Sequence, residues 1–156
     1  MFKYSLLALA ALALPAASHA QGSYLTSVNT MELQQLSVGL GHTVVETGEL
    51  GATSIRAQDE NGLTYLLLGT ACDDNEMNCN GINMQVLYTV ENPDYYQINQ
   101  ANLEWSAASV WYDPDSTALG ISTYVILDHG QSMDNLELIL GVLLSIAPEA
   151  VELAQQ

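Results

Sequence analysis

The pattern of apolar and polar residues along the chain predicts a series of strands and helices. In residues 82–90 an apolar side chain occupies every second position, which is typical of a strand with one buried face. Residues 63–71 are apolar almost throughout, as expected of a central strand buried on both faces. Further strands are predicted at residues 43–47, 53–58, 108–112 and 119–127.

Apolar residues at helical spacing predict three helices between these strands. The first begins at a capping box formed by Asn29 and Glu32. The second begins at Asn92, because a proline follows this N-cap residue at the first helical position. The third is capped by Ser132 and has a broad apolar stripe, and Pro148 is predicted to kink or restart it.

The order of these elements predicts an α+β fold, in which three helices pack on an antiparallel sheet. The strands at 63–71 and 82–90 are expected to form one hairpin, and those at 108–112 and 119–127 a second one. No internal repeat or long linker divides the chain. Residues 29–156 are therefore predicted to form one domain.

The first twenty residues resemble a secretory signal peptide. Lys3 lies in a short cationic start, an apolar run covers residues 6–14, and residues 18–20 read Ser-His-Ala. A retained anchor would need about 20 apolar residues, but Pro15 interrupts the run. We therefore expect residues 1–20 to be removed and residues 21–28 to form a flexible start. The product is expected in a Gram-negative periplasm or the medium, and no later window has spanning length.

The charge balance excludes several classes of partner and activity. The chain has 18 acidic residues against Lys3 and Arg56, a formal net charge of −16. Such a protein cannot neutralise nucleic-acid phosphates or anionic lipids through a basic patch. It also lacks the cation clusters of most phosphoryl-transfer sites. We therefore expect no nucleic-acid partner.

The two cysteines, Cys72 and Cys79, are predicted to form a disulfide. Export places them in an oxidising compartment, where thiols tend to pair. A ring closed over six intervening residues would stabilise the domain by about 2–3 kcal/mol. A zinc site would need four ligands, and a thioredoxin-like pair would need Cys-x-x-Cys spacing. The sequence provides neither of these.

The residues give little support to catalysis, so we expect neither an enzyme nor a cofactor. His42 and His129 both lie beside glycines, and exposed turns are their expected positions. The sequence has no Gly-x-Ser-x-Gly motif that would present a nucleophilic serine. Removal of residues 1–20 would also leave no lysine for Schiff-base chemistry.

Metal binding is considered for the acidic loop of residues 73–80. Asp73, Asp74 and Glu76 supply the oxygen ligands that Ca²⁺ prefers. An EF-hand loop starting at Glu76 fails, however, because its twelfth position is Leu87 rather than a bidentate carboxylate. The alternatives are a weak calcium site and an acidic loop in solvent.

Several of these features together resemble the YbjN-domain family, described as bacterial sensory transduction regulators with a fold like that of type III secretion chaperones. The resemblance spans roughly residues 29–150. The segments that carry it are Gly69-Thr70-Ala71-Cys72, Cys79, Ile98-Asn99-Gln100-Ala101-Asn102 and Asp113-Pro114-Asp115.

The resemblance implies a non-catalytic module that binds protein. Asn99 and Asn102 match the family position by position, and we expect their amides to hydrogen-bond strand ends or turns. Similar sequences carry basic residues after this pair, whereas this chain has Glu104. A family contact made by a cation on that helix is therefore not expected here.

The leading functional hypothesis is an exported YbjN-like domain that binds a basic or amphipathic polypeptide, in a chaperone-like or sensory-regulatory role. The alternative is a periplasmic module that binds calcium or a small ligand through residues 73–80. Analogy with related chaperone-like folds also suggests a homodimer. The acidic surface would serve either recognition of the partner or solubility.

Overall fold

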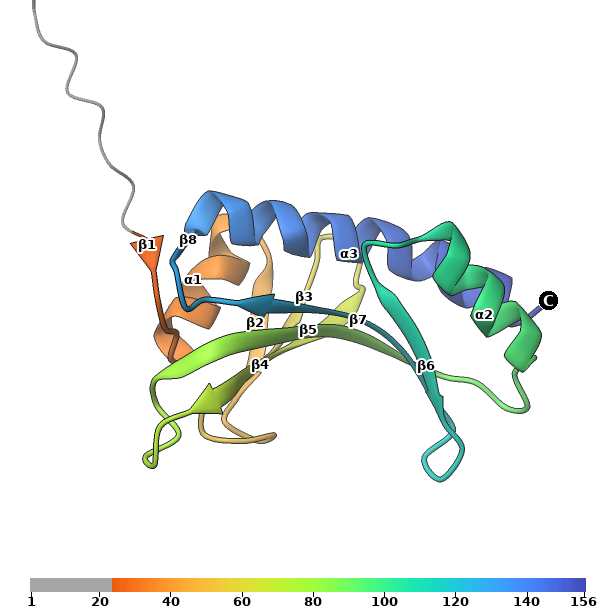
Figure 1. Cartoon of the computed structure of the whole chain (residues 1–156), viewed down its shortest axis with the longest axis horizontal. Helices are drawn as coiled ribbons and strands as arrows, with labels where there is room; N and C mark the ends of the chain where they lie inside the picture. The colour runs from red at the N-terminus through yellow and green to blue at the C-terminus, as the bar shows by residue number, and fades with distance from the viewer. Residues whose placement is uncertain (1–23) are drawn as a thin grey trace, which may run out of the picture.

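The computed structural model describes residues 24–156, which form an α+β fold. Three helices cover one face of a six-stranded antiparallel sheet (Figure 1), so the predicted fold class is confirmed. The predicted signal peptide, residues 1–20, lies outside the described residues. The elements are β1 (Tyr24–Leu25), α1 (Thr30–Gly39), β2 (Thr43–Thr47), β3 (Ser54–Gln58), β4 (Thr64–Cys72), β5 (Cys79–Thr89), α2 (Tyr95–Glu104), β6 (Ser109–Asp113), β7 (Ala118–Ile126), β8 (Gln131–Ser132) and α3 (Met133–Ala154).

The sheet has the strand order β2-β3-β4-β5-β7-β6. The two predicted hairpins are present as β4–β5 and β6–β7, and β7 also pairs with β5. The alternation in β5 buries Ile82, Met84 and Val86 against the helices. Buried residues of the neighbouring strands, such as Leu67 and Ile121, complete this core layer.

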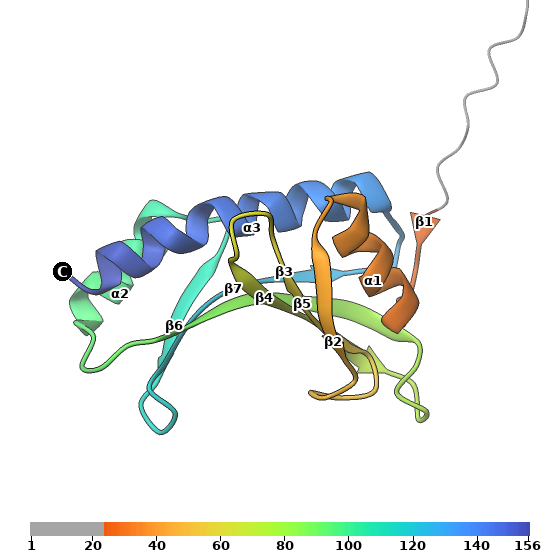
Figure 2. The same ribbon diagram turned by 180° about the vertical axis from the view of Figure 1, so that it is seen from behind.

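The long helix α3 runs along the length of the sheet (Figure 2) and buries one side of its apolar stripe. Ser132 caps it as predicted, since the Asn135 N–H donates to the Ser132 hydroxyl over 3.2 Å. The predicted restart at Pro148 is wrong, because α3 continues through this residue to Ala154. Ala147 and Ala150 are fully buried on either side of the proline, so packing holds both halves in place. No helix in residues 24–156 is long and apolar enough to cross a membrane.

The starts of α1 and α2 differ in how well they were predicted. The capping box of α1 is confirmed, because the Met31 N–H donates to the Asn29 side chain and the Asn29 N–H donates to Glu32. Helix α2 begins at Tyr95 with Asp94 as its N-cap, two residues later than predicted. Asn92 cannot fill that role, because its φ of 54° is left-handed, whereas an N-cap residue has extended backbone.

Residues 24–28 are part of the fold, so the predicted flexible start is wrong from Tyr24 onward. Tyr24 and Leu25 pair with β8. Val28 is 2% exposed, and its N–H and C=O both hydrogen-bond Cys79 at 2.9 Å. A two-residue strand and a single bridge leave no periodic pattern in the sequence, and this explains the error.

The predicted disulfide between Cys72 and Cys79 is confirmed. The two cysteines face each other across β4 and β5, and Cys79 is fully buried. The bond therefore closes the acidic loop at its base, where the loop joins the sheet.

Candidate functional site

Strand β7 extends beyond its neighbour β6 and leaves part of its edge without a partner strand. Pairing between the two strands ends at Ser109 and Ser122, whereas β7 continues to Ile126. On this side, residues 123–126 pair with no strand of the described chain. At about 3.3 Å per residue, this edge is roughly 13 Å long.

Two residues of this bare edge turn their backbone groups outward. In an antiparallel pair, alternate residues exchange hydrogen bonds with a given neighbour. The Leu127 N–H donates to the Asn80 C=O over 2.9 Å, so Val125 and Thr123 also bond toward β5. Tyr124 and Ile126 therefore direct their N–H and C=O groups away from β5, where residues 24–156 offer them no hydrogen-bond partner.

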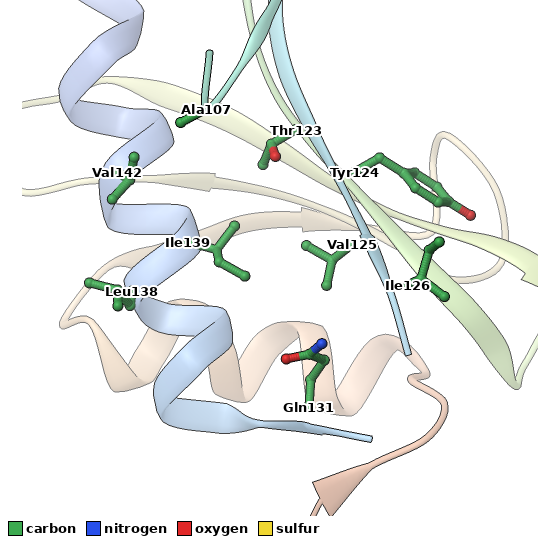
Figure 3. Close-up of a pocket in the computed structure, with 9 residues that line it drawn as sticks. All are labelled: Ala107, Thr123, Tyr124, Val125, Ile126, Gln131, Leu138, Ile139 and Val142. Atoms are coloured by element: carbon green, nitrogen blue, oxygen red, sulfur yellow. The ribbon is translucent and has the colours of Figure 1, made fainter. Parts of the chain in front are cut away.

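An apolar groove of about 550 Å³ lies between this edge and α3 (Figure 3). Its α3 wall consists of Leu138, Ile139 and Val142. Leu138 and Ile126 are exposed to 66% and 61%, so both sides of the groove present apolar side chains to solvent. The groove is lined by Ala107, Thr123, Tyr124, Val125, Ile126, Gln131, Leu138, Ile139 and Val142, none of which is charged.

The outer edge of β6, in contrast, is covered at Val110 by Asn102 of α2. The Asn102 amide donates to the Val110 C=O over 2.9 Å, and its oxygen accepts the Val110 N–H over 2.9 Å. The same amide also donates to Ile98 C=O in its own helix. The strand-end role predicted for Asn102 is thus confirmed. The Asn99 side chain is exposed and hydrogen-bonds no residue of the described chain, so the same prediction has no support there.

The sheet face that the helices leave open carries Trp111. Its indole lies against Gly120, and its N–H donates to the Ser122 hydroxyl over 3.2 Å. Tyr124 stands on the same face, with its hydroxyl 3.0 Å from that of Thr70. These aromatic rings are therefore outside the main core.

The acidic loop is shaped by Asp73, whose carboxylate accepts three hydrogen bonds. The donors are the backbone N–H groups of Asn75 and Met77 and the side-chain amide of Asn78. These bonds, the one from Met77 first, lower the pKa of Asp73 below its usual value. Glu76 has a left-handed φ of 57°, and its C=O accepts a hydrogen bond from Thr53.

These contacts do not bring the calcium candidates together as a set of ligands. Asp73 is bonded within its own loop, and the side chains of Asp74 and Glu76 make no hydrogen bond to another residue between 24 and 156. Across that same stretch of chain, no group of three or more His, Cys, Asp or Glu side chains is placed to hold a metal.

The two histidines occupy different environments. His42, predicted to be an exposed turn residue, is partly buried, and its Nδ1 lies 2.9 Å from the Tyr65 hydroxyl. Tyr65 is 1% exposed and its burial raises its pKa, so His42 contacts the edge of the core. The sequence did not reveal this contact, because the two residues lie 23 positions apart. His129 is exposed in a turn, as predicted.

The described residues are strongly anionic. They include all 18 acidic residues and one of the two Lys and Arg residues, Arg56, so their formal charge is 1 − 18 = −17. Arg56 lies 2.7 Å from Glu46 in an ion pair. No other lysine or arginine is present in this part of the chain to neutralise the remaining carboxylates.

Comparison with known proteins supports the fold. No family model and no curated protein matches the chain. The structure is similar to that of an uncharacterized protein from Methanothermobacter thermautotrophicus, with a TM-score of 0.50 and 11% sequence identity. The match covers 81% of this chain and 96% of the other. The likeness thus supports the α+β architecture, while the YbjN resemblance rests on its sequence motifs.

Proposed function

We propose that this domain binds an extended segment of another polypeptide in the groove between β7 and α3. The observation that carries this proposal is the bare edge of β7 beside an apolar wall. Proteins normally protect exposed strand edges, because free N–H and C=O groups pair readily with another chain. A known mode of peptide recognition uses such edges, with main-chain bonds for affinity and side-chain pockets for specificity.

The other two edges support this interpretation. Asn102 bonds Val110 on the outer edge of β6. Strand β2 is short and has a register shift between Val44 and Glu46, and bulges of this kind protect edges. Residues 86–89 of β5 and 70–72 of β4 also extend beyond a neighbouring strand, but the apolar groove of about 550 Å³ lies beside residues 123–126.

The proposed role is recognition rather than catalysis. The groove residues include no His, Asp, Glu, Lys or Cys, which are side chains that commonly transfer protons in catalysis. The disulfide supports the further proposal that the protein works outside the cytoplasm, as the signal-like sequence of residues 1–20 also indicates. The chaperone-like or sensory-regulatory role implied by the YbjN resemblance would use the same groove.

A peptide selection tests the proposed function. Random peptides displayed on phage are selected on the folded domain and then on a Leu138→Ser variant, which removes part of the groove wall. Leu103→Ser is the matched control, because Leu103 is also an exposed leucine on a helix, at 71%, and lies outside the groove. We expect peptides that bind the wild type and the control but not the Leu138 variant. No enrichment, or equal binding to all three proteins, would refute the proposal.

A further inference from the structure

We infer that the occupant of this groove is a cationic strand with alternating apolar residues, which runs antiparallel to β7 in line with β6. This inference rests on the proposed function and specifies the chemistry of the partner. Three features carry it: the direction of the neighbouring ladder, the two sides of the groove, and the charge of the domain.

The direction follows from the backbone. Strand β6 is antiparallel to β7 and its first pair is Ser109 with Ser122. A segment that ends beside Ser109 would continue this antiparallel ladder along residues 123–126. Its residues opposite Tyr124 and Ile126 would exchange both N–H and C=O bonds with them, as in the hydrogen-bonded pairs of an antiparallel sheet.

The side-chain pattern follows from the two faces of β7. Directly opposite residues on paired strands share one face of the sheet. Residues placed opposite Thr123 and Val125 would therefore point toward α3, where Leu138 and Val142 form an apolar wall. Residues placed opposite Tyr124 and Ile126 would lie on the open face in solvent. The groove thus requires an apolar side chain at every second position and accepts polar ones between them.

The charge decides what the polar positions carry. The described chain has a formal charge of −17. Asp128 and Asp134 lie three residues before and after Gln131, which lines the groove, and both are exposed without a cation in the described residues to pair with them. Lysine or arginine on the open face would be attracted at long range, and complementary charges speed association. A second copy of this chain would bring the same negative charge, so we do not assign it as the occupant.

The test compares three fluorescein-labelled octapeptides by anisotropy on the full domain. The first alternates lysine and valine, the second alternates glutamate and valine, and the third contains the lysines and valines in two blocks. We expect saturable binding of the first and at least about tenfold weaker binding of the others, a difference of about 1.4 kcal/mol. Raising the salt from about 0.02 M to about 0.5 M should weaken the first peptide several-fold.

Two measurements locate the binding site. Hydrogen exchange followed by NMR should show that the peptide slows exchange of the Tyr124 and Ile126 amides, which face the open edge, and leaves those of Thr123 and Val125 unchanged. An Ile126→Pro variant should lose binding, because proline lacks the N–H. This N–H does not take part in the β5 ladder, so the fold should tolerate the change. The exchange measurement on the wild type remains decisive if the variant does not fold.

The outcomes separate this inference from the proposed function. If phage-selected peptides require Leu138 but carry no excess of lysine and arginine, or if the acidic or blocked octapeptide binds equally well, the inference is wrong and the proposed function stands. If selection also yields nothing that depends on Leu138, both are wrong. A concentration-dependent dimer that disappears in Ile126→Pro would show that a second copy occupies the edge, which overturns the inference. Absence of binding by the alternating lysine–valine peptide would also show that the inference is wrong.

Discussion

The contact between Asn102 and Val110 allows a controlled test of how the edge of β6 is protected. Replacing Asn102 by alanine removes two hydrogen bonds to the Val110 backbone, each 2.9 Å long. Each such bond contributes about 0.5–1.5 kcal/mol, so the loss should be about 1–3 kcal/mol. Alanine is also the better helix former, by about 0.5–0.7 kcal/mol, which offsets part of this loss.

The matched control is Asn99→Ala, three residues earlier in the same helix. Asn99 is exposed and its side chain hydrogen-bonds no described residue, so this variant should show only the gain in helix propensity. The difference between the two variants in urea unfolding, followed by circular dichroism, therefore isolates the bonds to Val110. We expect Asn102→Ala to be less stable than the control by about 1–3 kcal/mol, with faster exchange of the Val110 amide. Equal stability, or unchanged exchange at Val110, would refute the reasoning.

Three further predictions concern the disulfide, the open sheet face and the acidic loop. Replacing Cys72 and Cys79 by serine, or reducing the disulfide, should lower the free energy of unfolding by about 2–3 kcal/mol. Urea unfolding with and without reductant measures this change. Because the two cysteines are separated by 7 positions, equal stability in both conditions would contradict the loop-closure argument. Gly120→Ala would place a Cβ inside the indole of Trp111, so it should destabilise the domain by about 1–3 kcal/mol and shift the tryptophan emission. Because the folded state lowers the pKa of Asp73, its contribution to stability is present above the unfolded value of about 3.9 and is lost as the pH falls through the folded value. The stability gap between wild type and Asp73→Asn should therefore shrink in acid, and a gap that stays constant with pH would show that this ionisation does not stabilise the loop.

Local patterns predicted the elements of the fold well, because each depends on neighbouring residues. The period of two in β5 and the capping box at Asn29 both appear as expected. The start of α2 was misplaced because Asn92 and Asp94 are both good N-cap residues. The left-handed backbone of Asn92 that decides between them is not encoded in residue type alone.

Long-range arrangement could not be predicted in the same way. Nothing in the alternation of β7 indicates that it pairs with β5 as well as with β6. The packing of Val28 on Cys79 likewise joins residues about fifty positions apart. Such contacts depend on which strand faces are buried together, so they require the folded structure.

The candidate groove was also missed, although the sequence contained two signals for it. The strand predicted at residues 119–127 is much longer than the one predicted at 108–112. In the structure, β7 is likewise longer than β6. The apolar stripe of α3 was also broader than burial requires, because Leu138 and Val142 add an exposed row to it. Either signal alone fits an ordinary helix or hairpin, and only their placement side by side defines the groove.

The position of Asn102 links the fold to the proposed site. By bonding Val110 it holds the start of β6 next to α2. The chain enters the sheet only at Ser109, and Ala107, two residues earlier, lines the groove. If this segment continued along the sheet instead, it would pair with residues 123–126 and fill the space that a partner strand would use. The amide that protects one strand edge therefore also keeps its neighbour's edge free. The bare edge of β7 therefore begins opposite the start of β6, next to the residue that Asn102 binds.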